Sequence, residues 1–439
     1  MQSYKEFVDE LESLYANARS DSKRYLNEIA AATNGQAKSE LYRLVAVPTR
    51  RKFGAFFTDE TTARFAAKFL KRVIQQGGIV CDPACGAGDL LLACTEFLKP
   101  AQDLRHTVRN WGQRIIGWDL QREFVEACRL RLALKSIERS QSRLRVTSPD
   151  PELFTGIRVQ DGLAKTIELA DVGAVIMNPP FTTMRAPRET AWASGSINTS
   201  AFFFEHVAAQ ISPGTKVVAI LPDVLRSGTR YARWRAQVSS SMKVEKAIPL
   251  HQFDSTTDVH VFVLVATKKK NSTRTTLPNW SYRNTEFDST TKQQKSVGDL
   301  FAVSVGPVVE YREPNRGKWF PYLTARDLPS WTKISRDFPK RRFRGRKVRA
   351  PFVVVRRTSR PEDKHRAVAT IIGGRGEYAV ENHLVILEPK DGRLKSCQLL
   401  SDVLKCSETS AFLNHVIRCR HLTVSAVKSI PWIPLREQV

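Results

Sequence analysis

The chain has 439 residues, of which 42% are hydrophobic and 26% are charged, and its net charge is +25. This length exceeds one ordinary core and favours a folded protein of two or three domains over a disordered one. No apolar run is long enough to cross a membrane, no secretion signal is recognisable, and seven scattered cysteines without paired zinc spacing favour a reduced, cytoplasmic protein without a structural metal.

The N-terminal segment repeats apolar side chains at helical spacing, as in Phe7, Leu11 and Tyr15, and predicts a helical cap over residues 1–45. From residue 46 onward, short apolar segments alternate with helical stretches. This pattern is typical of parallel strands buried under helices on both faces. The predicted strands are 79–81, 114–118, 157–160, 174–177, 216–221, 244–249 and 259–267, and the main predicted helices are 61–73, 89–98, 122–134 and 200–210.

The predicted fold class is therefore α/β: a Rossmann-like, seven-stranded sheet over residues 46–267, then a mixed α+β domain over residues 275–439. A Lys-rich stretch, 268–273, predicts the linker between them. Residues 268–439 hold 34 Lys and Arg against 16 Asp and Glu, a net +18, whereas residues 1–267 carry +7. So uneven a surplus favours a polyanionic partner, above all nucleic acid, over a merely solvated basic surface.

The first predicted strand runs into a glycine turn, Asp-Pro-Ala-Cys-Gly-Ala-Gly, that opens a helix. Gly86 and Gly88 let the backbone approach a ligand where a side chain would collide. The next two strands end at Asp119 and Asp161, which suit a ribose diol and an adenine amino group. Because the carboxyl ends of parallel strands share one edge of the sheet, these residues predict a nucleoside-shaped cleft.

Other readings of this turn are weaker. A helix-capping role explains any one of the aspartates but not their recurrence at successive strand ends. The turn lacks the lysine of a phosphate-cradling loop, and Asp89 at the helix start disfavours a pyrophosphate. A cofactor with a cationic centre and an amino-acid tail fits these carboxylates better.

The fourth strand runs into Asn178-Pro179-Pro180-Phe181. Two prolines fix this turn and remove backbone N–H donors, so it presents oxygen acceptors. Asn178 Oδ1 and the Pro179 carbonyl each suit one hydrogen of a planar amine, whose nitrogen is then freed to attack a sulfonium methyl. Phe181 suits stacking on a base swung out of a helix. A proline-rich strand exit with a capping Asn is the alternative, but it does not explain a turn beside the cleft.

In these motifs the chain resembles the γ class of N6-adenine DNA methyltransferases. The family has an aromatic Gly-x-Phe-x-Thr segment, an Asp-Pro-x-x-Gly-x-Gly turn, an Asn-Pro-Pro-aromatic turn and a target-recognition domain. These match residues 54–58, 82–88, 178–181 and the basic C-terminal third. The resemblance covers about residues 46–267 and implies a methyltransferase sheet, S-adenosylmethionine as cofactor and double-stranded DNA as substrate. A separate restriction endonuclease is a further expected partner.

The resemblance also implies roles for single residues. The residues expected to bind the cofactor are Phe57, Thr58, Asp82, Ala84, Gly86 and Gly88 around its methionine part, Asp119 at the ribose, Asp161 at the adenine ring, and Asn178. Two positions depart from the family pattern: Asp59 stands where proline is usual, and Phe181 where tyrosine is commoner. The second stacking aromatic is assigned to Phe253, with His251 as the alternative.

The C-terminal third supplies the residues expected to bind DNA. Residues 340–349 concentrate cations around one aromatic, which suits phosphate contacts, and a solvated basic loop is the alternative. The predicted DNA-binding residues are Phe253, Arg341, Arg342, Arg344, Arg346, Arg356 and Arg357. Segment 182–198 is expected to close over the DNA or the flipped base and to be disordered without them.

Three other functions stay open at this point. An RNA-adenine or protein-glutamine methyltransferase would use the same catalytic turn. A non-catalytic DNA-binding subunit would keep only the scaffold, against which the intact Asn178, Gly86 and Gly88 count. A restriction enzyme fused to its methylase would need a nuclease motif, and the sequence has no convincing one.

Overall fold

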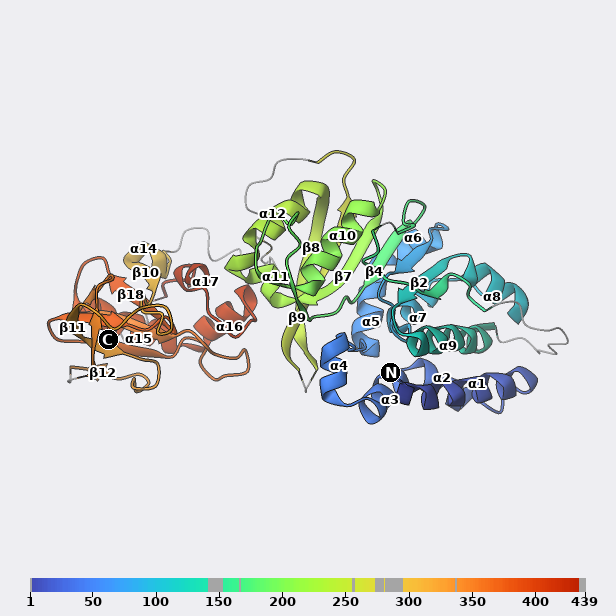
Figure 1. The fold of residues 1–439 in the computed structure, drawn as a ribbon, viewed down its shortest axis with the longest axis horizontal. Coiled ribbons are helices and arrows are strands. Elements are labelled where there is room, and N and C mark those ends of the chain that lie inside the picture. Colours follow the sequence, from blue (N-terminus) through green and yellow to red (C-terminus); the bar gives the residue numbers. More distant parts are fainter. Residues whose placement is uncertain are drawn as a thin grey trace. The chain divides into compact units, whose positions relative to one another are not determined.

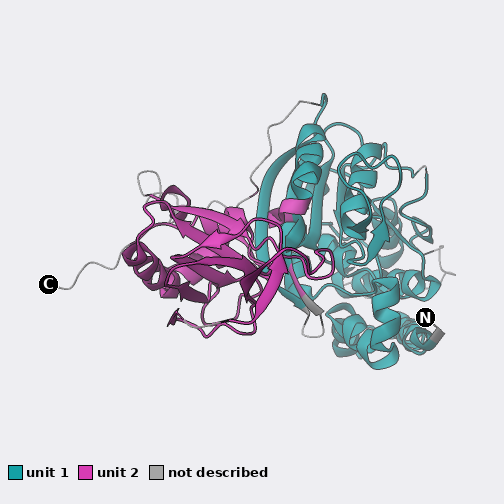
Figure 2. Ribbon diagram, turned by 60° about the vertical axis from the view of Figure 1, so that its left-hand side comes forward, with its two compact units in different colours: residues 1–225, 231–255, 261–279 teal, residues 226–230, 256–260, 280–439 magenta. Residues whose placement is uncertain are grey.

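The computed structural model describes residues 2–140, 153–165, 167–254, 257–272, 280, 295–335 and 338–433. The end of the predicted linker at Thr273 and parts of the predicted C-terminal domain (275–279, 281–294, 336–337 and 434–439) lie outside the described residues. The chain divides into two compact units (Figure 2): residues 1–225, 231–255 and 261–279 form the first, and residues 226–230, 256–260 and 280–439 form the second.

The first unit contains a seven-stranded sheet with strand order β3-β2-β1-β4-β7-β9-β8 (Figure 1). β1 pairs in parallel with β2 and β4, β2 with β3, and β4 with β7. The strands are β1 (Val80–Asp82), β2 (Ile115–Asp119), β3 (Ile157–Val159), β4 (Ala174–Met177), β7 (Lys216–Pro222), β8 (Met242–Asp254) and β9 (Thr257–Lys268).

The prediction that all seven strands form one parallel series is wrong for the last of them, because β9 is antiparallel to β7. The physical reason is the connection between β8 and β9. β8 ends at Asp254 and β9 begins at Thr257, whereas a parallel crossover needs a dozen or more residues.

The order of the strands explains which face of the sheet each helix covers. The chain steps from β1 to β3 toward one edge and from β4 to β7 toward the other. Right-handed crossovers therefore put the two sets of helices on opposite faces, which confirms the predicted α/β fold class. The helices are α7 (Asp89–Thr95), α8 (Leu104–Gly112) and α9 (Arg122–Ser140) in the first half, and α10 (Thr199–Gln210), α11 (Asp223–Ser227), η3 (Thr229–Tyr231) and α12 (Ala232–Ser241) in the second, with a hairpin of β5 (Thr183–Arg185) and β6 (Ser196–Asn198) before α10.

The N-terminal residues fold into helices, of which α1 and α2 contact α9 (Figure 1). The face of α1 that carries Phe7, Leu11 and Tyr15 is buried, as its helical spacing predicts. Asp59 caps α5 by accepting a hydrogen bond from the Thr62 backbone at 2.9 Å, a contact that proline could not make. These helices are η1 (Gln2–Tyr4), α1 (Lys5–Ser20), α2 (Leu26–Thr33), α3 (Gln36–Leu44), α4 (Val47–Phe53), α5 (Glu60–Ala67), η2 (Lys68–Leu70) and α6 (Lys71–Gln75).

The second unit is rich in strands, with a five-stranded sheet of order β10-β18-β15-β16-β12 and a four-stranded sheet of order β13-β11-β17-β14. Along β15, Val353 and Val355 belong to a core shared with the helices, whereas Val354 belongs to a core shared with the smaller sheet. The five-stranded sheet is thus covered on both faces, which confirms a mixed C-terminal fold. The elements are α14 (Val297–Leu300), β10 (Phe301–Val305), β11 (Lys318–Leu323), β12 (Lys333–Ile334), β13 (Lys340–Phe343), β14 (Val348–Arg349), β15 (Phe352–Arg356), β16 (Ala369–Ile372), β17 (Glu377–Val380), β18 (Leu384–Pro389), α15 (Leu394–Lys405), α16 (Ser407–Val416) and α17 (Val424–Lys428).

Candidate active site

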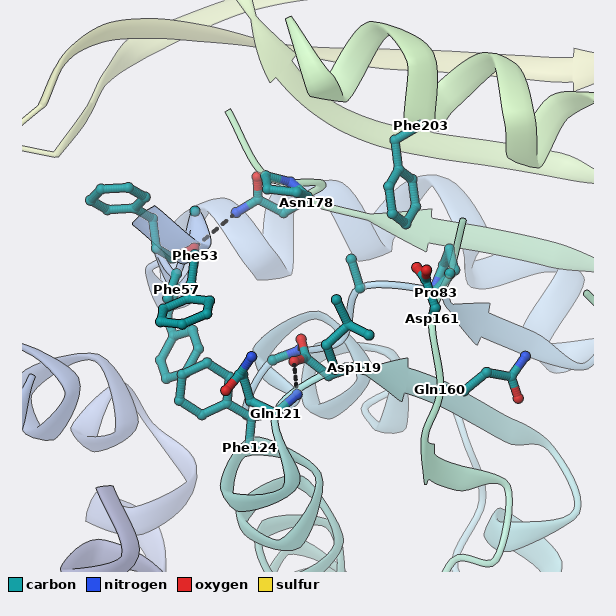
Figure 3. Close-up of a pocket in the computed structure, with 18 residues that line it drawn as sticks. Phe53, Phe57, Pro83, Asp119, Gln121, Phe124, Gln160, Asp161, Asn178 and Phe203 are labelled. Carbon is teal, nitrogen blue, oxygen red and sulfur yellow. Dashed lines mark hydrogen bonds between the residues drawn. The ribbon is translucent and has the colours of Figure 1, made fainter. Parts of the chain in front are cut away.

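A pocket with about 680 Å³ of open space lies at the carboxyl ends of the first unit's strands (Figure 3). It opens where the strand order reverses between β1 and β4, the place at which open α/β sheets bind ligands. The pocket is lined by Phe53, Gly54, Ala55, Phe56, Phe57, Pro83, Ala84, Gly86, Asp119, Leu120, Gln121, Phe124, Gln160, Asp161, Gly162, Asn178, Pro180 and Phe203.

Most of the predicted cofactor residues line this pocket: Phe57, Ala84, Gly86, Asp119, Asp161 and Asn178. The others support these residues from outside the lining: Thr58 accepts a hydrogen bond from Asn178, Asp82 accepts one from Ala84, and Gly88 precedes the first turn of α7. Sequence reasoning missed the apolar wall, which includes Leu120, Phe124 and Phe203. Of these three residues, only Leu120 could have been found from the sequence, because it directly follows Asp119; in the structure it is 62% exposed. The two phenylalanines have the spacing of an ordinary core and give no such signal.

The glycine turn is closely packed from behind. Gly86 has a φ of +52°, and a Cβ there would lie 2.9 Å from the Phe57 ring. Gly88 has a φ of +89°, and a Cβ there would lie 2.5 Å from Cys128 Sγ. Both positions therefore require glycine for conformation and for space, which leaves the backbone of the turn open toward the pocket.

Two carboxyl groups at this turn have unusual environments. Burial, together with a smaller contribution from the nearby Asp119, raises the pKa of Asp82 to about 8. Burial raises the pKa of Asp119 to about 6. Asp119 is held in place, since Oδ2 accepts from the Gly86 N–H at 3.1 Å and Oδ1 from the Gln121 N–H at 2.8 Å. A buried carboxylate carries a desolvation cost that a bound cation offsets, so the site fits a positively charged ligand.

The side-chain amide of Asn178, directly after β4, has a fixed orientation. Nδ2 donates to Thr58 Oγ1 at 3.0 Å and to the Phe56 carbonyl at 3.4 Å. Because a carbonyl can only accept, these contacts assign Nδ2 to that side. Oδ1 is buried and has no hydrogen-bond partner among the described residues, and Pro179 beside it is buried. An unpaired buried acceptor is costly, so the site fits a ligand that donates a hydrogen here.

Neighbouring segments pack against the rest of the Asn-Pro-Pro-Phe turn on both sides. A Cβ on Gly54, whose φ is +63°, would lie 2.4 Å from Pro180 Cβ, so only glycine permits this contact. Asn198 Nδ2 donates to the Phe181 carbonyl at 3.5 Å. The Phe181 ring meets Phe253 edge to face, with ring centroids 5.2 Å apart and an interplanar angle of 71°. The two predicted stacking aromatics therefore lie together.

The segment after this turn is an ordered hairpin, which corrects the expectation that residues 182–198 are disordered. β5 and β6 pair antiparallel. Between them, Trp192 is buried and its indole N–H donates to Glu205 on α10. This aromatic anchor helps to hold the loop in place, while Arg185 and Arg188 stay exposed.

The predicted DNA-binding arginines of the second unit fall into two groups. Arg342, Arg344 and Arg346 are exposed. The guanidinium of Arg342 lies 5.0 Å from the centroid of the Trp319 ring, and Arg346 pairs with Glu388. The other three are half-buried and hold the unit's own backbone: Arg341, Arg356 and Arg357 donate to the carbonyls of Glu313, Leu328 and Asn382. The exposed group is the better placed for contacts with a partner.

The described residues contain no cluster of His, Cys, Asp and Glu that could hold a metal ion. In the part of the chain that the structure covers, no helix combines the length and the apolar character needed to cross a membrane.

A doubly wound sheet with a pocket at its switch point defines a broad class of proteins that bind nucleotide-like cofactors. The sequence pattern of the N-6 DNA methylase family matches residues 38–298 of the chain. The chain belongs to this family, as the motifs predict. No match was found among curated protein sequences.

Several solved structures are similar to the chain. The type IIL restriction-modification enzyme MmeI, in complex with DNA, is 12% identical with a TM-score of 0.54, over 92% of this chain and 72% of that one. The type IIG restriction endonuclease BpuSI is 13% identical with a TM-score of 0.46, over 92% of this chain and 62% of that one. A type I methyltransferase subunit from Streptococcus thermophilus is 18% identical with a TM-score of 0.37, over 56% of this chain and 51% of that one. The chain thus spans less than two thirds of BpuSI, and its likeness to MmeI is one of fold.

Proposed function

We propose that the chain is a site-specific DNA methyltransferase that transfers a methyl group from S-adenosylmethionine to the N6 amine of an adenine flipped out of duplex DNA. It serves as the modification enzyme of a restriction-modification or related defence system, beside a separate restriction endonuclease. The observation that carries the proposal is the amide of Asn178. Thr58 orients it so that a buried Oδ1 stays without a partner, among the described residues, at a pocket suited to a cationic nucleoside.

The residues present fit this cofactor. The backbone of the glycine turn at Gly86 accommodates the methionine part, whose ammonium group offsets the desolvation of Asp82. Asp119 keeps lone pairs for the ribose hydroxyls, because each of its oxygens accepts one backbone hydrogen bond. Asp161 accepts from the adenine amino group, while Leu120 supplies an apolar face for the ring.

The catalytic residues act on the target amine. S-adenosylmethionine supplies a methyl group activated by a sulfonium. Asn178 Oδ1 and the Pro179 carbonyl accept the two amine hydrogens and make the nitrogen more pyramidal, so that its lone pair is directed at the methyl carbon. With the cofactor bound, the amine held in this way would take the methyl group and then lose one proton. Phe181 and Phe253 hold the flipped base by stacking.

This function divides the chain into a helical cap over residues 1–45, a methyltransferase domain over residues 46–267 and a target-recognition domain over residues 275–439. In the last of these, the exposed Arg342, Arg344 and Arg346 contact phosphates. Their contribution is electrostatic and weakens as the salt concentration rises.

The test is a substrate panel. The full chain is incubated with methyl-labelled S-adenosylmethionine and, separately, with duplex DNA, structured RNA and a protein extract. We expect label in duplex DNA, with N6-methyladenine in the digested nucleosides and at one short sequence when the sites are mapped. Label that enters only RNA or only protein would overturn the proposal, as would a methylated cytosine in place of adenine.

A further inference from the structure

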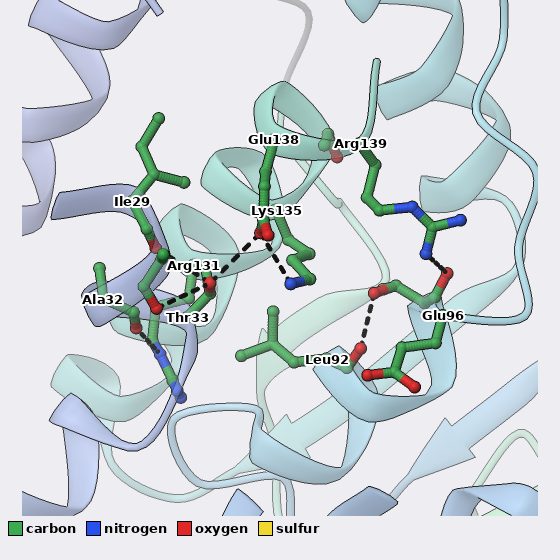
Figure 4. Close-up of polar contacts among 12 residues, drawn as sticks. Ile29, Ala32, Thr33, Leu92, Glu96, Arg131, Lys135, Glu138 and Arg139 are labelled. Atoms are coloured by element: carbon green, nitrogen blue, oxygen red, sulfur yellow. Dashed lines mark hydrogen bonds and ion pairs between the residues drawn. The ribbon is translucent and has the colours of Figure 1, made fainter. Parts of the chain in front are cut away.

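A fully buried arginine, Arg131 of α9, joins the N-terminal helices to the glycine turn, and Figure 4 shows its contact with the first of these. Its Nε donates to the Ala32 carbonyl near the end of α2 at 2.8 Å. Its Nη1 donates to the carbonyl of Ala87, between the two glycines of the turn, at 2.5 Å. Its Nη2 lies 2.9 Å from Oδ1 of Asp89, the first residue of α7. One guanidinium therefore joins two separate segments of the chain, α2 and the glycine turn that opens α7.

The burial of this group makes the three contacts depend on one another. A guanidinium out of water is tolerated only when it is paired and hydrogen-bonded. Its planar fork has a rigid geometry, so a shift of one acceptor disturbs the contacts to the others. A change in the glycine turn is therefore transmitted to α2, and a displacement of α2 is transmitted to the turn.

A second contact links the same helices to the pocket. Tyr4 is buried, and its hydroxyl donates to the Ala37 carbonyl at 3.1 Å. Its ring meets Phe57 and Phe124 edge to face, with centroids 6.0 and 5.1 Å apart. Both phenylalanines line the pocket, so the N-terminal residues form a second layer behind its wall.

We propose that Arg131 is a positioning residue for the cofactor, through which docking of the N-terminal helices and binding of S-adenosylmethionine stabilise each other. The inference rests on the proposed function. The turn contains two glycines in the left-handed region, Gly86 and Gly88, and a bound cofactor restricts it. A fixed Ala87 carbonyl then fixes Arg131 and, through it, α2. Coupling of this kind is reciprocal, so loss of the arginine weakens the binding of the cofactor.

The first test needs no variant. Amide hydrogen exchange of the full chain is measured with and without saturating S-adenosylhomocysteine, which is the product left by S-adenosylmethionine after methyl transfer. We expect slower exchange in residues 26–33 of α2 as well as in residues 82–91 of the turn. Protection confined to the turn overturns the inference, whatever becomes of the variants.

The second test compares Arg131→Met with a matched control, Arg139→Met. Arg139 lies on the same helix and donates to the Thr95 and Leu98 carbonyls at 3.3 Å each, outside the turn (Figure 4). We expect the Kd of S-adenosylhomocysteine, by titration calorimetry, to rise roughly tenfold in Arg131→Met, within the usual range of coupling between sites. The control should lower the melting temperature and leave the Kd unchanged.

The kinetic signature is a higher KM for S-adenosylmethionine with kcat unchanged at saturation, because the arginine acts through the turn and touches no reacting atom. Equal Kd values for the two variants overturn the inference. If the unaltered chain binds neither S-adenosylmethionine nor S-adenosylhomocysteine, the proposed function itself fails, and that result is distinct from a loss confined to Arg131→Met.

Discussion

The role of Thr58 gives the sharpest prediction, because the structure and the family resemblance suggest different things. Thr58 is buried, and its hydroxyl accepts the stronger of the two hydrogen bonds that orient Asn178. Thr58→Val keeps the shape of the side chain and removes this acceptor. The stranded Nδ2 hydrogen costs about 1–3 kcal/mol, so the amide loses its preference for presenting Oδ1 to the target amine.

If the Asn178 amide is flipped, its Nδ2 hydrogens face the target amine. The amine is itself a hydrogen donor, so no hydrogen bond forms between them. If orientation limits the chemical step, the loss of about 1–3 kcal/mol slows methyl transfer roughly 5- to 150-fold. The dissociation constant of S-adenosylmethionine should change less than this rate, because Asn178, although it lines the cofactor pocket, directs its Oδ1 at the target amine. Thr58→Ser, which keeps the hydroxyl, should behave like the unaltered chain.

The assay is single turnover with preformed protein–DNA complex and saturating labelled S-adenosylmethionine, so that product release does not mask the chemical step. The cofactor Kd is measured separately by calorimetry. An unchanged transfer rate in Thr58→Val together with a raised Kd would refute the reasoning and support a direct contact of Thr58 with the methionine part.

Three further predictions concern the pocket and the aromatic pair. Gly86→Ala sets a Cβ 2.9 Å from the Phe57 ring, so calorimetry should show a much higher cofactor Kd in a folded protein; an unchanged Kd would exclude the turn as the cradle. Burial raises the pKa of Asp82 to about 8, so its ionisation destabilises the fold increasingly as the pH rises from about 4, the unfolded-state value, to 8. Asp82→Asn should therefore raise the melting temperature at pH 8.5 but hardly at pH 4, and a pH-independent gain would contradict this. Phe253→Ala removes the ring beside Phe181, and stacking of about 1–3 kcal/mol per base predicts a smaller fluorescence rise from 2-aminopurine at the target position; an undiminished rise would count against the pair.

Local patterns in the sequence were enough to predict the sheet and the edge at which the site lies. Strand ends are marked by turn residues, and parallel strands bring such ends together, so the meeting of Asp119, Asp161 and Asn178 in one pocket could be expected. Their roles in binding and catalysis stay predictions. The fit of Asp59 as a helix cap also follows from its neighbours along the chain.

Contacts between distant segments could not be predicted in this way. Thr58 and Asn178 are 120 positions apart, and nothing in either motif indicates that one orients the other. Arg131 stands on a helix that is buried on nearly all sides, so no polar stripe distinguishes it from a surface arginine. The anchoring of the hairpin by Trp192 is of the same kind, because its partner Glu205 belongs to the next helix.

The central claim is that Asn178 holds an adenine amine for methylation, and the most direct measurement is transfer to mapped adenines in duplex DNA by Asn178→Ala. Asn110→Ala, an exposed asparagine on α8, is the matched control. The account predicts that Asn178→Ala loses roughly 100- to 1,000-fold in the rate of N6-methyladenine formation, as for the removal of one stabilising group at a reacting centre. The cofactor affinity should fall far less than this rate, and the control should keep full activity. Full methylation by Asn178→Ala would contradict the account.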